Sequence, residues 1–133
     1  MNEELIKYKY KLNEINNTKD SLEIWYNEMI NKSESELSLL DINRMFRQNV
    51  LVELALDKAI IILLKDPFVG ESTNGDVLEN MLVINKDLLK TRTDDLKKVI
   101  IKADNNKNNV AWWYPEEKDE YFELIDQLKK TIK

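Results

Sequence analysis

The amino-acid sequence predicts an all-α protein, and three observations lead to this prediction. The 133 residues include only two glycines and two prolines, whereas an all-β fold needs a turn about every 8–12 residues and builds its turns largely from those two residue types. Hydrophobic residues make up 43% of the chain and charged residues 34%, which is typical of a globular domain. Apolar residues recur mainly at helical spacing. We therefore expect residues 1–133 to form a single domain, a bundle of about five or six helices around a central apolar helix.

Residues 1–16 form either a peripheral helix or a strand. Leu5, Tyr8 and Leu12 follow a helical seam, yet the apolar residues of this stretch also alternate with lysines, as they would in a strand. Glu3 and Glu4 favour the start of a helix, because the helix dipole stabilises negative charge there. We favour the helix, although the pattern of residues 5–12 fits both a helix and a strand.

Two helices are expected between residues 18 and 48, separated by a polar linker over residues 31–36. Thr18 is the predicted N-cap of the first helix, and Asp41 is the predicted N-cap of the second. The first helix buries Leu22, Trp25, Tyr26, Met29 and Ile30, and the second buries Ile42, Met45 and Phe46.

Residues 50–65 are apolar on almost every side, so they are expected to form the central helix. Asp66 and Pro67 end it, because the residue before a proline resists helical geometry. A loop over residues 68–75 follows. Asp76 then starts a short helix whose inner residues are Val77, Leu78, Met81 and Leu82.

Two more helices complete the predicted bundle. Thr93 caps the first of them, and an asparagine-rich loop over residues 105–109 follows. The helix over residues 115–132 begins at Pro115, because proline is favoured at the first helical position. The first helix buries Leu96, Val99, Ile100 and Ala103, and the last buries Tyr121, Leu124, Ile125, Leu128 and Ile132.

The composition excludes several kinds of site. The absence of cysteine rules out disulfides and thiol chemistry, and the absence of histidine removes the commonest general base and metal ligand. We expect no cofactor and no metal. A net charge of −5 disfavours direct nucleic-acid binding and favours a basic partner. The first residues do not resemble a signal peptide, and the most apolar stretch is too short to span a bilayer, so we expect a cytoplasmic protein without a membrane segment.

Glu53 and Asp57 are the first candidates for carboxylate chemistry, because their i, i+4 spacing places them on one helix face. With Asp76 they could serve an enzyme as acid and base. They are also the polar residues that an apolar helix would turn towards water, and a metal site in a helical bundle would normally include a histidine. We therefore expect neither enzymatic activity nor a metal site.

Three consecutive aromatic residues, Trp112, Trp113 and Tyr114, cannot all enter one core from a regular helix, because neighbouring side chains diverge by about 100°. At least one would lie on the surface and anchor a protein interface, unless all three close the end of the bundle. Four acidic residues follow: Glu116, Glu117, Asp119 and Glu120. They suit the dipole at a helix N-terminus, and they would also steer a cationic partner towards this surface.

Three segments resemble one family. They are Leu40-Asp41-Ile42-Asn43-Arg44-Met45-Phe46-Arg47-Gln48-Asn49, the helix end Leu63-Leu64-Lys65-Asp66-Pro67, and Gly75-Asp76-Val77-Leu78. In order and spacing they are similar to immunity proteins of contact-dependent growth inhibition and related polymorphic toxin systems, over roughly residues 22–89. Thr73-Asn74 departs from the family, which often has Tyr-Pro or Tyr-Glu before the Gly-Asp step.

This resemblance implies an all-helical cytoplasmic protein that binds a cognate toxin domain and blocks its active site or its access to substrate. Such toxins are very often nucleases, and the net charge of −5 complements the cationic surface that a nuclease needs. The predicted contacts are Trp112 or Trp113 with the four acidic residues that follow, and Glu71 and Asp76 in the loop after residue 68 are the second choice. The alternative is a helical adaptor or regulator of another pathway.

The residues of the family motif have both a structural and a functional interpretation. Arg47 and Gln48 would either contact the toxin or brace backbone carbonyls where the two central helices meet. Asp66 and Pro67 end a helix, and Gly75 forms a turn before the next one. We favour the structural role for all five residues.

Overall fold

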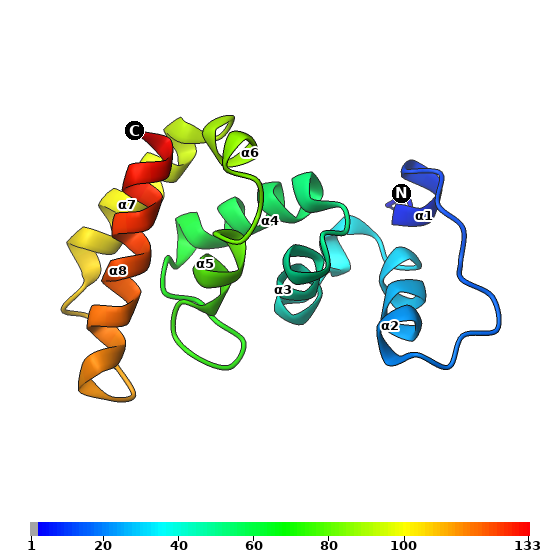
Figure 1. Ribbon diagram of the computed structural model, residues 1–133, viewed down its shortest axis with the longest axis horizontal. Helices are drawn as coiled ribbons and strands as arrows, with labels where there is room; N and C mark the ends of the chain where they lie inside the picture. Colours follow the sequence, from blue (N-terminus) through cyan, green and yellow to red (C-terminus); the bar gives the residue numbers. More distant parts are fainter. Residues whose placement is uncertain (1–2) are drawn as a thin grey trace. The chain divides into compact units, whose positions relative to one another are not determined.

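The computed structural model describes residues 3–133, whose regular elements are all helical (Figure 1). Along the chain they are α1 (Ile6–Lys9), α2 (Ser21–Ile30), the 3-10 helix η1 (Glu34–Glu36), α3 (Leu39–Gln48), α4 (Val52–Lys65), α5 (Asp76–Met81), α6 (Lys86–Lys90), α7 (Thr93–Asn106) and α8 (Pro115–Ile132). Within the described residues, β-type pairing is limited to one isolated bridge between Leu5 and Ser33. The all-α prediction is confirmed, with more helices than expected because η1 and α6 form short helices of their own. Among residues 3–133, no helix is both long enough and apolar enough to cross a membrane.

The chain divides into two compact units, Met1–Asp41 and Ile42–Lys133, and the boundary falls inside α3. In the first unit α1 contacts α2, and the Ile6 backbone N–H donates a hydrogen bond of 2.9 Å to the Lys32 carbonyl. The helix that we favoured near the N-terminus is present but only four residues long, and Lys11 adopts a left-handed φ of 55° shortly after it. One domain over residues 1–133 stays a prediction, which a single melting transition would support.

The predicted N-cap of α2 is wrong. Asp20, not Thr18, precedes the helix, and its carboxylate accepts hydrogen bonds from the backbone N–H groups of Leu22 and Glu23 at 2.7 and 3.3 Å. A cap must lie directly before the first turn for its side chain to reach these groups, and Thr18 lies too early in the chain. The core-facing side agrees with the prediction at the buried residues Trp25, Met29 and Ile30.

Asp41 is a buried polar centre of the first unit and not the N-cap that we predicted. α3 begins at Leu39, so Ser38 takes the cap position, and its hydroxyl accepts a hydrogen bond of 3.1 Å from the Asp41 backbone N–H. The Asp41 carboxylate accepts hydrogen bonds from the Ser38 N–H at 3.0 Å, the Trp25 indole N–H at 2.8 Å and the Lys32 ammonium at 2.6 Å. Burial alone would raise the pKa of Asp41, but these hydrogen bonds outweigh burial and lower it.

We expect Asp41→Asn to lower the free energy of unfolding by about 2 kcal/mol at pH 7, because the amide cannot accept all three hydrogen bonds and leaves a buried donor unsatisfied. Since folding lowers this pKa, the stabilisation is present above the unfolded-state value of about 3.9 and is lost as the pH falls through the folded-state value. Urea unfolding at pH 7 and pH 3 checks this, with the exposed Glu28→Gln as control. A wild-type advantage over Asp41→Asn that is equally large at both pH values would contradict it.

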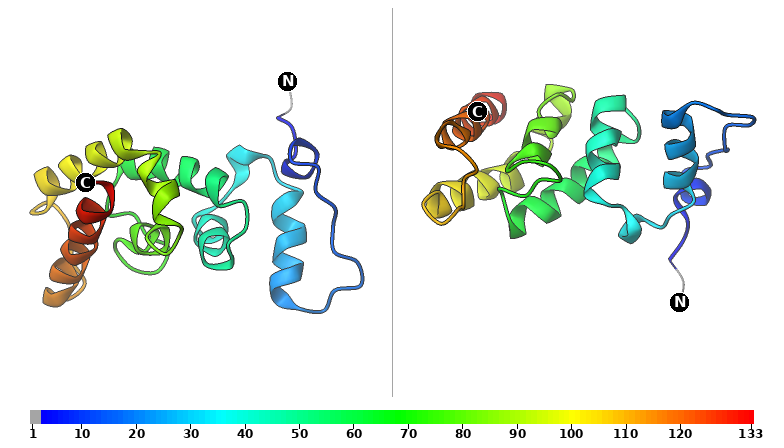
Figure 2. Two further views of the ribbon diagram at one scale, coloured as in Figure 1. Left: turned by 45° about the horizontal axis from the view of Figure 1, so that its top comes forward. Right: turned by 90° about the horizontal axis from the view of Figure 1, so that it is seen from below.

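In the second unit, α4 is the central apolar helix that the sequence predicts. It contacts α5 and α7, while α6 and α7 contact α8. α7 and α8 lie side by side and run in opposite directions (Figure 2). The buried residues of α4 are Leu54, Ala55, Leu56, Ala59, Ile60 and Leu63.

The N-terminus of α7 departs from the prediction, whereas that of α8 agrees with it. Thr93 is the first residue of α7 and not its cap, because its hydroxyl donates to the Lys90 carbonyl at 2.7 Å. α7 then continues to Asn106, so the asparagine-rich loop is shorter than expected. α8 begins at Pro115 as predicted. Its buried hydrophobic residues are Tyr121, Ile125, Leu128 and Ile132, and Leu124 is half-buried.

Candidate functional site

The carboxylates of Glu53 and Asp57 are bound by an arginine that lies far from them in the sequence. Arg92 Nε donates to Asp57 Oδ1 at 2.8 Å, and Arg92 Nη2 donates to Glu53 Oε1 at 3.2 Å. The hydrogen bond to Asp57 raises the pKa of the guanidinium. The two carboxylates therefore tether Arg92, at the start of α7, to α4. This structural role does not favour a catalytic role for Glu53 and Asp57. Among the described residues, no group of three or more acidic side chains could hold a metal ion.

The family-motif residues Asp66, Pro67 and Gly75 build a closed loop between α4 and α5. The Asp66 carboxylate accepts a hydrogen bond of 3.0 Å from the Phe68 N–H, and the Gly75 N–H donates one of 2.8 Å to the Phe68 carbonyl. The Tyr121 hydroxyl of α8 donates to the Pro67 carbonyl at 2.8 Å. Burial of this tyrosine raises its pKa. Asp66, Pro67 and Gly75 thus all contribute hydrogen bonds that close this loop.

Gly75 has no room for a side chain. Its φ is +79°, in the left-handed region that favours glycine. A Cβ atom built on Gly75 would lie 2.4 Å from Cδ2 of Tyr121, closer than two carbon atoms can approach. The glycine therefore lets the loop turn and lets the ring of Tyr121 pack directly on the backbone.

Asp76 organises the same loop from the first residue of α5. Its carboxylate accepts hydrogen bonds from the backbone N–H groups of Glu71, Ser72 and Thr73 at 2.9, 2.8 and 3.2 Å. The side-chain amide of Asn43 in α3 donates a fourth at 3.1 Å. Asp76 is thus occupied inside the protein, which disfavours it as a toxin contact, whereas the side chain of Glu71 is exposed.

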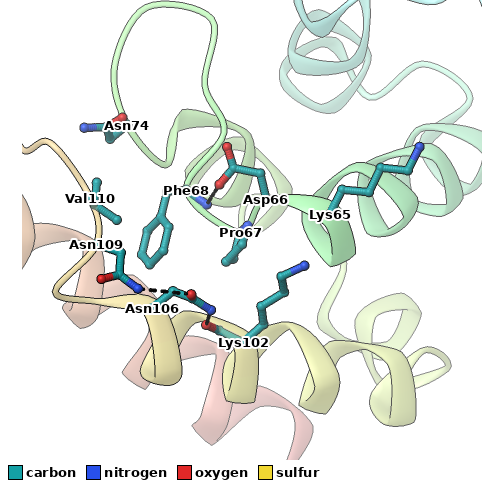
Figure 3. Close-up of a pocket in the computed structure, with 9 residues that line it drawn as sticks. All are labelled: Lys65, Asp66, Pro67, Phe68, Asn74, Lys102, Asn106, Asn109 and Val110. Carbon is teal, nitrogen blue, oxygen red and sulfur yellow. Dashed lines mark hydrogen bonds between the residues drawn. The ribbon is translucent and has the colours of Figure 1, made fainter.

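A polar hollow of about 300 Å³ lies beside this loop, near the C-terminal ends of α4 and α7 (Figure 3). The amide of Asn106 donates to the Lys102 carbonyl at 2.8 Å, and the Lys102 ammonium donates to the Leu64 carbonyl at 2.7 Å. These side chains satisfy carbonyls in the last turns of the two helices. Their hydrogen bonds account for the polar lining as helix-end structure.

Of Trp112 and Trp113, only Trp113 is strongly exposed. The ring of Trp112 packs edge-on against Phe68, with centroids 5.5 Å apart, and against Tyr121 at 5.9 Å. Trp113 is 72% exposed and the neighbouring Tyr114 is 42% exposed. Both interpretations of the aromatic run therefore hold in part, because Trp112 closes the end of the core and Trp113 reaches the surface.

One of the four acidic residues after Tyr114 is buried inside the protein. Glu117 is only 3% exposed, and its Oε1 accepts hydrogen bonds from the Asn74 side-chain amide at 2.8 Å and from the Trp113 backbone N–H at 3.1 Å. The expectation that Glu117 joins a surface cluster is therefore wrong. Its carboxylate instead fixes the backbone of Trp113 to the loop before α5.

The other three carboxylates, those of Glu116, Asp119 and Glu120, are exposed on the first turns of α8. The Tyr114 hydroxyl donates a hydrogen bond of 2.7 Å to Glu120, and this bond raises the pKa of Tyr114 to about 12. These three acidic residues, Tyr114 and Trp113 lie close together in the sequence and are all exposed. We call them the aromatic-acidic surface: Trp113, Tyr114, Glu116, Asp119 and Glu120.

Residues 7–99 match the sequence profile of a family described as CDI immunity proteins, where CDI stands for contact-dependent growth inhibition. The chain belongs to this family. The resemblance of the three motifs is thereby confirmed. No curated protein and no solved structure matches the chain. The part of this CDI immunity protein that matches the family includes the closed loop before α5, and it ends before the aromatic-acidic surface begins.

Arg47 and Gln48 of this CDI immunity protein lie exposed at the C-terminal end of α3. In the described part of the chain, neither side chain forms a hydrogen bond or an ion pair, so the predicted bracing of carbonyls is not seen. Asn49 and Leu51, which follow, have left-handed φ angles of 55° and 45°. The motif at the end of α3 thus leaves its two polar side chains available to a partner.

Proposed function

We propose that this CDI immunity protein acts in the cytoplasm of the cell that makes it and neutralises a cognate toxin domain by binding it with the aromatic-acidic surface. The high exposure of Trp113, on a backbone that Glu117 holds in place, is the observation that carries this proposal. Because the backbone of Trp113 is already fixed, binding through this residue has less conformational entropy to lose. Tryptophan is also among the residues that contribute most to binding energy at interfaces.

The charge of the surface favours a cationic toxin domain. Glu116, Asp119 and Glu120 project negative charge next to Trp113, and the whole chain carries a net charge of −5. A nuclease must present a positive surface to the phosphates of its substrate. An acidic inhibitor would bind that surface and exclude the nucleic acid, so we propose a nuclease as the class of toxin.

The test is surface-plasmon-resonance kinetics with the toxin domain encoded beside the gene. We expect Trp113→Ala to speed dissociation about 30-fold, which corresponds to about 2 kcal/mol at a contact of this kind. Reversing Glu116, Asp119 and Glu120 to lysine should slow association and reduce its dependence on salt, because long-range attraction governs the rate of encounter.

The matched controls leave this surface intact. Tyr8→Ala removes an aromatic side chain that is 65% exposed and lies outside the aromatic-acidic surface. Changing Glu28, Glu79 and Asp94 to lysine alters the net charge as much as the triple reversal does. If folded Trp113→Ala and triple-reversal variants bind the toxin like the wild type, the interface lies elsewhere on the protein.

A further inference from the structure

Lysines gather at the C-terminal end of α8, at the opposite end of this helix from the aromatic-acidic surface. They come from α6, from the N-terminal half of α7 and from the last turns of α8, three segments that lie together in the second unit (Figures 1 and 2). All six side chains are exposed, and we call them the lysine surface: Lys86, Lys90, Lys97, Lys129, Lys130 and Lys133.

Two shallow hollows flank the end of α8 within the lysine surface. One, of about 430 Å³, has a floor of Ile100, Ile101 and Ile132, and its other lining residues are lysines. The second, of about 350 Å³, lies on the α6 side and contains three lysines. No aspartate or glutamate is among the residues that line either hollow. Ile101, which is 59% exposed, offers an aliphatic contact inside the basic rim.

Helix dipoles explain the position of only some of these lysines. Lys129 and Lys130 suit the C-terminus of α8 and Lys90 suits that of α6, where cations are stabilised. Lys86, by contrast, is the first residue of α6, where the dipole disfavours a cation, and Lys97 lies beyond the first turn of α7, where the dipole has little effect. In the described chain, only Lys129 of the six forms an ion pair, with Asp104 at 3.6 Å. The surface therefore keeps positive charge that the fold itself does not neutralise.

We propose that the lysine surface binds a short acidic protein segment whose aliphatic side chain contacts Ile101. Carboxylates of such a segment would pair with the lysine rim, and its apolar residue would cover the isoleucine floor. This interaction is distinct from toxin binding at the other end of α8. It gives one acidic protein two docking ends of opposite charge.

A protein segment fits this surface better than a nucleic acid does. Single strands bind where bases stack on aromatic side chains, and the lining of the two hollows contains neither an aromatic residue nor an arginine. The net charge of −5 also repels a long polyanion. A short acidic segment responds mainly to the local field, because charges more than about 10 Å away are screened at 0.1 M salt.

The test is fluorescence anisotropy with the full chain and a fluorescein-labelled peptide in which two leucines are flanked on both sides by glutamates. We expect binding that weakens with added salt. The double variant Lys97→Glu with Lys133→Glu should lower the affinity about tenfold or more, because it reverses the charge of the rim. Ile101→Ser should lower it about fivefold, through loss of apolar contact area.

The matched control is Lys65→Glu with Lys107→Glu, which makes the same change in net charge and should leave the affinity unchanged, since both residues are exposed and lie outside the lysine surface. Melting curves establish that each variant is folded. Three results would overturn the proposal: no binding beyond that of an uncharged serine–leucine peptide of the same length, equal loss in both double variants, or tighter binding of a labelled oligo(U) that depends on the same lysines.

Discussion

Replacing Gly75 by alanine is expected to lower the free energy of unfolding by about 3–4 kcal/mol, which is a fall in Tm of more than about 10 °C. The left-handed φ of +79° accounts for about 1 kcal/mol of this loss, and the rest comes from the contact at 2.4 Å between the new Cβ and Tyr121. Differential scanning calorimetry of the full chain measures the effect. Thr73→Ala is the control, because its side chain is exposed and its backbone N–H to Asp76 remains.

A double-mutant cycle separates the two causes. In a Tyr121→Ala background the ring is absent, so Gly75→Ala should cost only the contribution of the backbone, about 1 kcal/mol. Equal effects of Gly75→Ala in the two backgrounds would show that the close contact with Tyr121 contributes nothing.

Replacing Asp76 by alanine is expected to lower the free energy of unfolding by about 3 kcal/mol, because four donors lose an ionised acceptor. Asp76→Asn should be almost as harmful. Both oxygens of the carboxylate accept hydrogen bonds, and an amide nitrogen at either place would face a donor. Urea unfolding provides the measurement.

Glu79→Gln is the control for Asp76, because it neutralises an exposed carboxylate three residues along the same helix. Its free energy of unfolding should stay within about 0.5 kcal/mol of the wild type. A loss in Asp76→Ala no larger than this would mean that the loop before α5 does not depend on the carboxylate.

The fold class followed from the sequence because apolar spacing reports which side of a helix is covered. The central helix and the start of α8 at Pro115 agree with that pattern. Helix caps were harder to predict, since Ser, Thr and Asp residues two or three positions apart compete for the same backbone N–H groups. In the structure Asp20 and not Thr18 is the N-cap of α2, and Ser38 and not Asp41 takes the cap position of α3.

The site was only partly predictable, because long-range partners decide what each charged side chain does. Glu117 resembles its acidic neighbours in the sequence, but Asn74, 43 residues away, draws its carboxylate inside the protein. Arg92 similarly binds Asp57 from a distance of 35 residues along the chain. The exposure of Trp113 was anticipated in kind, since three adjacent aromatic residues could not all be buried, but only the structure distinguishes it from Trp112.

The hydrogen bonds of Glu117 have a consequence for how partner specificity can change during evolution. The carboxylate joins Asn74, inside the part of the chain that matches the family, to the backbone of Trp113, outside it. It holds residue 113 by its main chain, so the junction does not depend on which side chain that residue carries. Substitutions at 113 and at the exposed acids of α8 can therefore change the surface that we propose for toxin binding without a compensating change in the part of the chain that matches the family.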